Sequence, residues 1–347
     1  MTYKKILIAP LNWGLGHASR CVPIINQLLK NNFEPIIASD GNALKLLQKE
    51  FPNLKSYKLP SYNITYSKNS FFFNLHLLLK APHIWKAVQQ EKKLVEEIIQ
   101  KENIQGIISD NRFGVCHSST PSVYITHQTT VFSGITTPIT TFFHQNIIKK
   151  FNECWIPDDE KTRISGKLSF SYRNLNQKFI GTLSRFQKQD IPTQNDILII
   201  LSGPEPQRTY LEEILKEKFQ NTKKQVLMIR GIITKENQTT QILSNFKIKD
   251  FLLTKELEKE LNHSNLIICR AGYSSIMDLY KLNKNAILIP TPNQKEQEYL
   301  ATYLQKKDLF TSIKQSKLKD FDFENFKVEK EQKLQKITSK IDFSIFR

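Results

Sequence analysis

The stretch that decides the fold is NLIICRAGYSSIMDLYKLNKNAILIPTPNQKEQ, residues 265–297. Its pattern predicts a buried strand at 266–269, a polar turn at 270–273, a helix at 274–282, a second buried strand at 286–290 and a polar loop. Short apolar runs that flank a helix are typical of parallel strands, because such strands are covered on both faces. The stretch therefore predicts an α/β layer.

The turn in this stretch predicts an anion site. Arg270, Gly272, Ser274 and Ser275 lie at the expected helix start, where free backbone N–H groups and the helix dipole attract phosphate. Asp278 follows three residues after Ser275. A phosphate site with a carboxylate nearby suits a sugar nucleotide, with the diphosphate on the N–H groups and the ribose on the carboxylate. The alternative is a capping box, Ser275-x-x-Asp278, that only satisfies the helix start.

The size and composition favour a soluble protein of about two domains. The chain has 347 residues, of which 39% are apolar and 24% charged, as in ordinary globular proteins. No apolar run approaches the roughly 18–20 residues that span a membrane, and the N-terminus has no signal-peptide pattern. We therefore expect a cytoplasmic protein. The four cysteines are far apart and form no CxxC pair, so we expect neither a disulfide nor a bound metal.

The charge distribution indicates a partner that is both anionic and hydrophobic. The net charge is +17, which is compatible with anionic substrates, lipid surfaces or nucleic acid. Residues 51–90 and 111–152 contain no acidic residue; the first stretch includes FFFNLHLLLK (71–80) and the second ends in ITTFFHQNIIKKF (139–151). Such basic, aromatic segments favour peripheral contact with an anionic membrane at its inner face. Nucleic acid is disfavoured, because the chain shows no recognisable nucleic-acid module.

A strand–turn–helix unit recurs along the chain and predicts two doubly wound domains. In the first domain, 1–182, we expect strands at 5–10, 35–39, 104–109, 122–126, 153–157 and 179–181, and helices at 18–30, 43–49 and 71–100, the last broken near Pro82. A linker is expected at 183–195. In the second domain, 196–347, we expect strands at 196–201, 226–230, 251–253, 266–269, 286–290 and 310–313, and helices at 210–219, 274–282 and 329–339. The charged terminal helix could pack back on the first domain.

The first expected strand leads into a glycine loop, GLGH (14–17). Gly14 and Gly16 allow the backbone to approach a ligand. The loop lacks the third glycine of GxGxxG, which disfavours a dinucleotide site. His17 could take a proton from an acceptor hydroxyl, because an imidazole titrates near neutral pH. The alternative is a structural histidine.

Strand ends offer further candidates. Asp110 ends a buried strand, the place where ligands sit in open α/β sheets; it is a second candidate base, with a turn cap as the alternative. His127 and Gln128 end the next strand and, together with Asn12, could lie on the acceptor side. In the second half, Ser202 and Gly203 begin SGPEPQR (202–208), a further candidate phosphate loop or a plain turn.

These residues resemble a known family. Arg270, Gly272, Ser275 and Asp278, followed by IPTP, Glu296, Gln297 and Leu300-Ala301, are similar to the pattern Arg-x-Gly-x-x-Thr/Ser-x-x-Glu and the Gln-containing loop of GT-B glycosyltransferases. The resemblance is nearest to glycosyltransferase family 28, which includes the lipid II-forming N-acetylglucosaminyltransferase of peptidoglycan synthesis. GLGH is similar to the family's Gly-Gly-His loop, and SGPEPQR occupies the place of its second glycine-rich loop.

The resemblance implies a GT-B fold, two Rossmann-like domains facing a cleft, and an inverting, metal-independent transfer of a hexosyl group, such as N-acetylglucosaminyl. It implies a UDP-sugar co-substrate without another cofactor, and a lipid-linked or glycan acceptor. Carried over, Asp278 holds the ribose, Gln297 the donor sugar, and Ser202 and Gly203 face the diphosphate, while His17 lies near the acceptor. The other donor-side candidates are Gly14, Gly16, Arg270, Gly272, Ser274, Ser275 and Glu296. Whether His17 or Asp110 is the base stays open.

Two other functions fit parts of the pattern. A sugar-nucleotide epimerase could use the same architecture, and it would leave the mass of the substrate unchanged. A basic nucleic-acid-binding protein is the less favoured alternative, because it needs clustered arginines and aromatic platforms.

Overall fold

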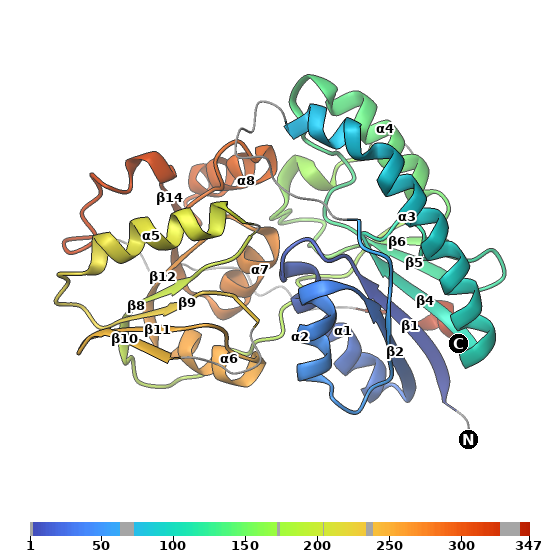
Figure 1. Ribbon diagram of the computed structural model, residues 1–347, viewed down its shortest axis with the longest axis horizontal. Helices are drawn as coiled ribbons and strands as arrows, with labels where there is room; N and C mark the ends of the chain where they lie inside the picture. Colours follow the sequence, from blue (N-terminus) through green and yellow to red (C-terminus); the bar gives the residue numbers. More distant parts are fainter. Residues whose placement is uncertain (1–2, 63–72, 172–173, 204, 234–238, 327–340) are drawn as a thin grey trace. The chain divides into compact units, whose positions relative to one another are not determined.

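The structure is a computed structural model that describes residues 3–62, 73–171, 174–203, 205–233, 239–326 and 341–347, without the side chains of 73–81 and 240–242. The described residues form two units (Figure 1): residues 3–62, 73–183 and 341–347 in the first, and 184–326 in the second. The expected 329–339 helix and the run 71–80 lie outside the described residues, except for the helical backbone of 73–80.

The first unit is built on a parallel sheet of order β3-β2-β1-β4-β5-β6-β7. Its strands are β1 (Lys4–Pro10), β2 (Phe33–Ser39), β3 (Ser56–Lys58), β4 (Ile104–Asp110), β5 (Ser122–Ile125), β6 (Glu153–Ile156) and β7 (Gln177–Phe179). Its α-helices are α1 (Gly16–Lys30), α2 (Gly41–Glu50), α3 (Phe73–Glu102) and α4 (Thr137–Ile148).

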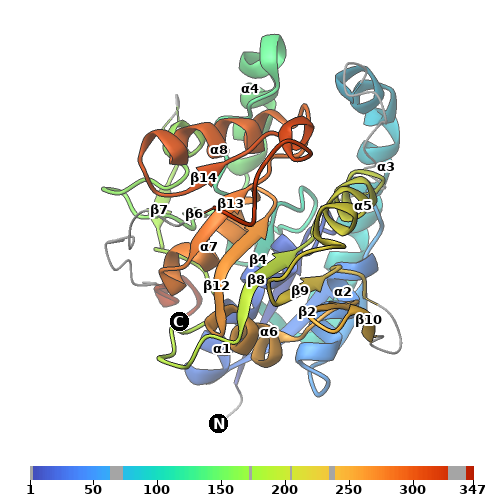
Figure 2. The same ribbon diagram turned by 90° about the vertical axis from the view of Figure 1, so that its left-hand side faces the viewer.

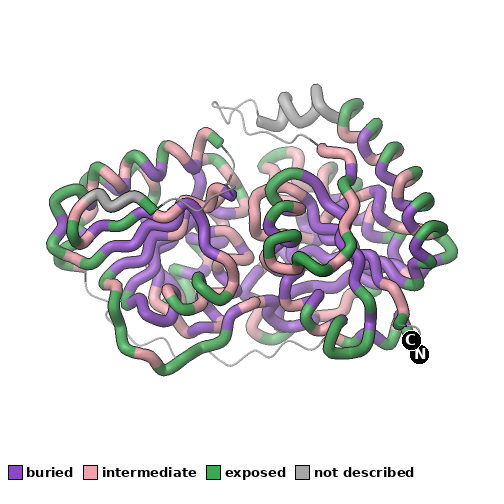
Figure 3. The backbone as a smooth tube through the Cα atoms, turned by 60° about the horizontal axis from the view of Figure 1, so that its bottom comes forward, coloured by how far each residue is buried: buried purple, intermediate pink, exposed green. Residues whose placement is uncertain are grey.

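Helices cover both faces of this sheet because its central strands are apolar throughout. In β1, Leu7 packs in one cluster with Val95 and Ile98 of α3, and the alternation of side chains along a strand sends Ile6 and Ile8 to the opposite face. All three β1 side chains are fully buried. Figure 3 shows buried residues concentrated in the strands of both units.

The end of the chain also belongs to the first unit. The rings of Phe343 and Phe33 lie 5.8 Å apart, and those of Phe343 and Trp155 lie 6.0 Å apart. Gly106 in β4 makes room for Phe346, because a Cβ at Gly106 would lie 2.4 Å from the Phe346 ring. Residues 341–347 are therefore part of the core of the first unit.

The second unit has a sheet of order β10-β11-β9-β8-β12-β13-β14, in which only the β10–β11 pairing is antiparallel among the described strands. Its strands are β8 (Asn195–Ile200), β9 (Val226–Ile229), β10 (Thr239–Leu243), β11 (Phe246–Lys249), β12 (Ser264–Cys269), β13 (Asn285–Leu288) and β14 (Thr311–Ser312). Its helices are α5 (Gln207–Phe219), α6 (Thr254–Asn262), α7 (Tyr273–Leu282) and α8 (Lys295–Lys306) (Figure 2).

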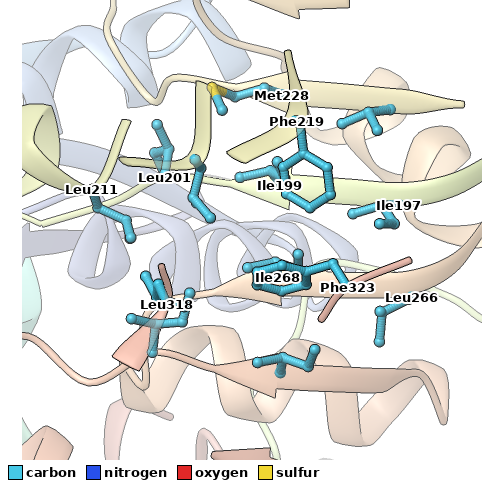
Figure 4. Close-up of a cluster of buried hydrophobic side chains, with 14 of the residues drawn as sticks. Ile197, Ile199, Leu201, Leu211, Phe219, Met228, Leu266, Ile268, Leu318 and Phe323 are labelled. Carbon is cyan, nitrogen blue, oxygen red and sulfur yellow. The ribbon is translucent and has the colours of Figure 1, made fainter. Parts of the chain in front are cut away.

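The core of the second unit lies between this sheet and α5. Leu211, Leu215 and Phe219 of α5 pack against alternate residues of the strands, such as Ile199 and Ile268 (Figure 4). Burying each such side chain contributes about 1.5–3 kcal/mol. The aromatic tail also closes this face, since the Phe219 and Phe323 rings lie 5.1 Å apart.

The structure confirms the predicted α/β class with two parallel-sheet units, but it corrects several elements. Helix α3 continues through Pro82, where a break was expected, because a proline removes only one backbone donor and neighbouring turns can hold the helix. The strand expected at 251–253 is wrong; β10 and β11 precede it as a hairpin and α6 follows. Helix α4 was not predicted as a helix.

The segment expected to be a linker packs along the second unit. The backbone N–H of Gln189 donates to Asn262 Oδ1 of α6 at 2.9 Å, and Asn262 Nδ2 donates to the Gln187 carbonyl at 3.0 Å. None of the helices described combines the length and apolar character needed to cross a bilayer.

Candidate active site

The first candidate site lies where the strand order of the first unit reverses. The chain leaves β1 for β2 on one side and returns to β4 on the other, and ligands bind at the carboxyl ends of such strands. Pro10 at the end of β1 is paired with Asp110 at the end of β4. The loop after β1 and the end of β4 therefore meet at one point.

At this point, His17 and Asp110 lie in one buried cluster with Arg20. His17 Nδ1 is 2.8 Å from Asp110 Oδ1. Arg20 Nε donates to Asp110 Oδ2 at 2.5 Å, and Arg20 Nη2 donates to Asp110 Oδ1. Arg20 Nη1 lies 3.1 Å from Nδ1 of His127, which follows β5. Three of the predicted residues are thus brought together, and Arg20 joins them.

The electrostatics of the cluster distinguish the two candidate bases. Burial alone would raise the pKa of Asp110, but Arg20 and His17 outweigh it and hold this pKa at about 2. Burial lowers the pKa of His17, against the opposing effect of Asp110. Asp110 is fully buried and ionised, whereas the side chain of His17 is 14% exposed. This arrangement suits His17 as the base and Asp110 as its partner, since a carboxylate with so low a pKa is a weak base.

The other candidates of the first unit, on the acceptor side (Asn12, His127, Gln128) and on the donor side (Gly14, Gly16), differ in how accessible they are. Asn12 donates to Asp40 Oδ2 at 3.2 Å and accepts from the Ala43 N–H at 3.2 Å, so it fastens its loop to the start of α2. His127 is 7% exposed, and Gln128 is half-buried. Gly14 adopts a φ of +80°, and a Cβ there would meet nothing within 4 Å. Its loop therefore needs the left-handed conformation and has open space beside it. Gly16 begins α1.

The second candidate site repeats this geometry in the second unit. The strand order reverses between β8 and β12, and Ser202 and Gly203 follow β8 while Gly272 follows β12. Each strand end leads to a helix N-terminus, that of α5 or α7. Ser274 and Ser275 are half-buried in the first turn of α7. Two neighbouring helix N-termini make a site where phosphate groups can bind.

Arg270 lies beneath these loops instead of beside open solvent. It is 1% exposed. Its Nη2 donates to the Gln207 carbonyl at 2.7 Å, and its Nη1 lies 3.4 Å from the carbonyls of Ile289 and Pro290. Burial lowers its pKa to about 10, which leaves it charged at neutral pH. Arg270 therefore joins the loop after β12 to the start of α5 and to the loop after β13. Its role toward a donor diphosphate stays a prediction.

Asp278 is not a helix cap. Helix α7 begins at Tyr273 with Gly272 as its N-cap, so Ser275 lies inside the first turn and the alternative of a Ser275–Asp278 capping box is wrong. Instead, Ser184 Oγ donates to Asp278 Oδ1 at 2.6 Å. Burial raises the pKa of Asp278 to about 7, against the opposing effects of Arg185 and Ser184. A desolvated carboxyl of this kind is typical of functional sites.

Gln297 and Glu296 lie at the start of α8. Gln297 Oε1 accepts from the Thr291 N–H at 2.9 Å, and the residue is 8% exposed. Its oxygen therefore holds the loop after β13, and its amide N–H groups remain for a ligand. Glu296 is half-buried in the first turn. Within the described ranges, no group of three or more His, Cys, Asp or Glu residues is arranged to hold a metal ion.

Two residues of these sites were not predicted from the sequence, Arg20 and Ser184. Arg20 lies three residues after His17, and this spacing puts both on one face of α1, a signal that could have identified it. Ser184 lies 94 residues before Asp278, and no local pattern links the two.

Known proteins are similar to this chain in sequence. Residues 197–341 match the Glycosyltransferase family 28 C-terminal domain. The chain is 22% identical over 323 residues to the UDP-N-acetylglucosamine–N-acetylmuramyl-(pentapeptide) pyrophosphoryl-undecaprenol N-acetylglucosamine transferase of Alkaliphilus oremlandii (strain OhILAs), covering 87% of this chain and 84% of the relative. The enzyme of the same description from Alkaliphilus metalliredigens (strain QYMF) is 22% identical over 319 residues, with 87% and 84% covered.

Solved structures show the same fold. The glycotransferase of kitacinnamycin superposes with a TM-score of 0.63 at 11% identity, covering 93% of this chain and 88% of that chain. MurG of Acinetobacter baumannii superposes with a TM-score of 0.51 at 13% identity, covering 91% and 87%. These neighbours are GT-B glycosyltransferases. The chain is thus a glycosyltransferase with the GT-B fold, and its residues 197–341 match the family 28 C-terminal domain.

Proposed function

We propose that this glycosyltransferase moves a hexosyl group, with N-acetylglucosaminyl as the first candidate, from a UDP-sugar to a lipid-linked or glycan acceptor. The observation that carries the proposal is the neutral, partly exposed imidazole of His17 held by the ionised Asp110. The printed names of the two Alkaliphilus relatives, which describe N-acetylglucosamine transfer to a pyrophosphoryl-undecaprenol acceptor, support the donor and acceptor classes.

In the proposed reaction, His17 carries its proton on Nδ1, bonded to Asp110 Oδ1, and Nε2 takes the proton of the acceptor hydroxyl. The acceptor oxygen then forms a bond to C1 of the donor sugar, and the bond from C1 to the diphosphate oxygen breaks. A single displacement of this kind inverts the anomeric centre. The diphosphate leaves with the bonding electron pair.

The donor side would stabilise that leaving charge without a bound metal. The N-termini of α5 and α7 present backbone N–H groups and positive dipole ends, and the buried charge of Arg270 reinforces them through the loops it holds. Such preorganised positive groups lower the barrier for a developing anion. Asp278 would accept the ribose hydroxyls, and Gln297 would donate to the donor sugar.

Product analysis tests the proposal. The protein is incubated with UDP-N-acetylglucosamine, UDP-glucose or a GDP-sugar, with and without a polyprenyl-pyrophosphoryl glycan acceptor, and the products are weighed by mass spectrometry. We expect acceptor-dependent release of UDP and a product heavier by one hexosyl unit. A sugar of unchanged mass but altered configuration would instead establish the epimerase.

Replacing Asp278 by asparagine tests the donor side. We expect the affinity for UDP to fall about tenfold or more, since a lost charge-assisted hydrogen bond costs roughly 1.5–3 kcal/mol. The ligand-free variant should nevertheless be more stable at pH 8. The pKa of Asp278 is raised to about 7 in the folded protein, so its stabilising protonation is complete at low pH and is lost as the pH rises through 7.

Calorimetric titration with UDP and thermal unfolding at pH 6 and pH 8 measure both effects. Asp278→Asn keeps an oxygen that can accept from Ser184, so the native contact is preserved in the variant. An exposed carboxylate in the same unit, Asp320, supplies the control Asp320→Asn, which should change neither quantity. UDP affinity that is unchanged in Asp278→Asn would remove the ribose assignment.

We further propose that one face of α4 and the turn before it contact an anionic membrane. Four apolar side chains are exposed here: Ile135 (100%), Ile139 (61%), Phe142 (47%) and Phe143 (63%). They follow a helical spacing and together form the α4 surface. The exposed Lys149 follows the helix end. A cluster of exposed apolar residues with a cation beside it is typical of interfacial helices.

A double variant, Ile139→Ser with Phe143→Ser, tests the α4 surface. We expect the protein to co-float with phosphatidylglycerol vesicles at low salt and to be retained less as salt screens the lysines; the double variant should be lost from the vesicle fraction. Tyr210→Ser, which removes an apolar side chain that is 39% exposed in the second unit, is the matched control. Equal retention of the double variant and the control would refute the membrane contact.

A further inference from the structure

Arg20 occupies the centre of the candidate active site although it has almost no access to solvent. Its side chain is 1% exposed, and Asp110 beside it is fully buried. Two nitrogens of its guanidinium bind the two oxygens of Asp110, the fork-to-fork geometry that lysine cannot reproduce. Because Arg20 does not reach the surface, it can act on a substrate only through the residues that it contacts.

The same guanidinium fixes the proton of His127. Arg20 Nη1 lies 3.1 Å from His127 Nδ1, and a guanidinium can only donate. Nδ1 of His127 can accept this bond only when it is unprotonated, and the proton of the ring then lies on Nε2. The contact with Arg20 therefore favours the Nε2–H tautomer of His127.

Arg20 also changes what His17 experiences. A histidine beside a lone buried carboxylate is driven toward its protonated form. Here the carboxylate is already paired. Arg20 Nη2 also lies 2.9 Å from His17 Nδ1, but in the proposed reaction both groups donate to the same oxygen, Asp110 Oδ1. The positive guanidinium beside the ring therefore disfavours a second proton on His17. The charged and titratable groups around His17 are Arg20 and Cys21 on α1, Asp110 at the end of β4 and His127 after β5; the Cys21 thiol lies 3.8 Å from Asp110 Oδ2. Burial, Arg20 and His127 lower the pKa of His17, and Asp110 raises it.

We propose that Arg20 is a positioning residue that keeps His17 unprotonated and His127 in its Nε2–H form, by binding both oxygens of Asp110 and Nδ1 of His127. The base is then ready to accept a proton at neutral pH. The inference rests on the proposed role of His17 for its effect on turnover, but the effect of Arg20 on the two rings is independent of that role.

Three variants separate the charge of Arg20 from its shape. Arg20→Gln removes the charge and leaves Asp110 unpaired, so His17 should titrate about one pH unit higher or more. Arg20→Lys keeps a charge next to Asp110 but loses the bond to His127, so His17 should titrate near its wild-type position while His127 loses its fixed tautomer. The double variant Arg20→Gln with Asp110→Asn removes both charges, and His17 should again titrate near the wild-type position.

NMR of the imidazole signals in the ligand-free protein measures the titration of His17 and the tautomer of His127, and His17→Gln assigns the signals. The acidic limb of the pH profile of kcat/KM measures the titration of the base during turnover. Arg112→Lys is the control, because Arg112 is an equally buried arginine paired with Asp40 and Glu91; it should destabilise the protein without moving the His17 titration.

The outcomes are distinct. An upward shift of the His17 titration in Arg20→Gln that the double variant reverses supports the inference. A His17 titration that stays in place in Arg20→Gln overturns it. If Arg20→Gln does not fold, the other two variants decide, because His17 should titrate near its wild-type position in both. A difference of about one pH unit or more between their His17 titrations would then overturn the inference. If the NMR titration moves while the acidic limb of kcat/KM does not, the role of Arg20 stands and His17 is not the base.

Discussion

Replacement of His17 by alanine is expected to lower kcat by about 10²–10⁴-fold, the usual contribution of a general base. The affinity for UDP should stay within about twofold, because no donor-side residue of the second unit is changed and uniform binding is preserved. The physical reason is the cluster itself: His17 is its most exposed titratable group, at 14%, and Asp110 is too acidic to replace it.

Steady-state kinetics with a fixed acceptor, together with calorimetric titration of UDP, separate these two effects. His117→Ala is the matched control, since His117 is half-buried in a loop of the same unit, bonded to Ser119, and lies outside the cluster. Full turnover by His17→Ala would exclude His17 as the base. A parallel loss of turnover and UDP affinity would point to misfolding, which circular dichroism detects.

Replacement of Asp110 by asparagine should give the largest loss of stability. Arg20 would then be a buried cation without its carboxylate, and removing one partner of such a pair costs roughly 3–5 kcal/mol. The loss should be complete at pH 7 and should shrink as the pH falls. The pKa of Asp110 is depressed from 3.8 to about 2, so its ionised form contributes about 2 kcal/mol above the unfolded pKa and loses this contribution as the pH falls through the folded pKa.

Urea unfolding of the two proteins at pH 7 and at pH 3 measures this difference. Glu160→Gln removes an exposed carboxylate from the same unit and should change the free energy of unfolding by less than about 0.5 kcal/mol at either pH. A difference between Asp110→Asn and the wild type that is small at pH 7, or that grows toward pH 3, would contradict the ion pair as the source of the stability.

Much of the fold follows from local sequence alone. The apolar runs that become β1, β4, β8 and β12 are short and continuous, which is typical of strands buried on both faces. The polar turn after each of them marks the strand end. Because parallel strands present their carboxyl ends at one edge, the positions of GLGH, Asp110, SGPEPQR and RAGYSS along the chain already predict the two candidate sites.

Other elements depend on partners that are distant in sequence. β10 and β11 form a hairpin at the sheet edge, and their short segment, TTQILSNFKIK (239–249), gives too weak a periodicity to distinguish it from the loop that follows. In α4 the apolar residues are largely exposed, whereas two of its three buried residues, Thr141 and Gln145, are polar. The apolar stripe therefore does not mark the buried face, and the sequence predicted a hydrophobic surface segment instead of a helix. Pro82 misled the reading of α3 because a proline only disfavours the helix locally.

The fold class, the two glycine-containing turns and most of the polar residues around them can be predicted from the chain, because these features depend on residues within a few positions of one another. The contacts that each residue makes depend on the folded arrangement. Strand pairing puts Asp110 beside His17 and Arg20, and α7 brings Asp278 to Ser184. The fold also buries Arg270, a donor-side candidate, so that its guanidinium contacts backbone carbonyls. Protonation states and partners of buried groups depend on what surrounds them in space, and one stretch of chain does not contain that information.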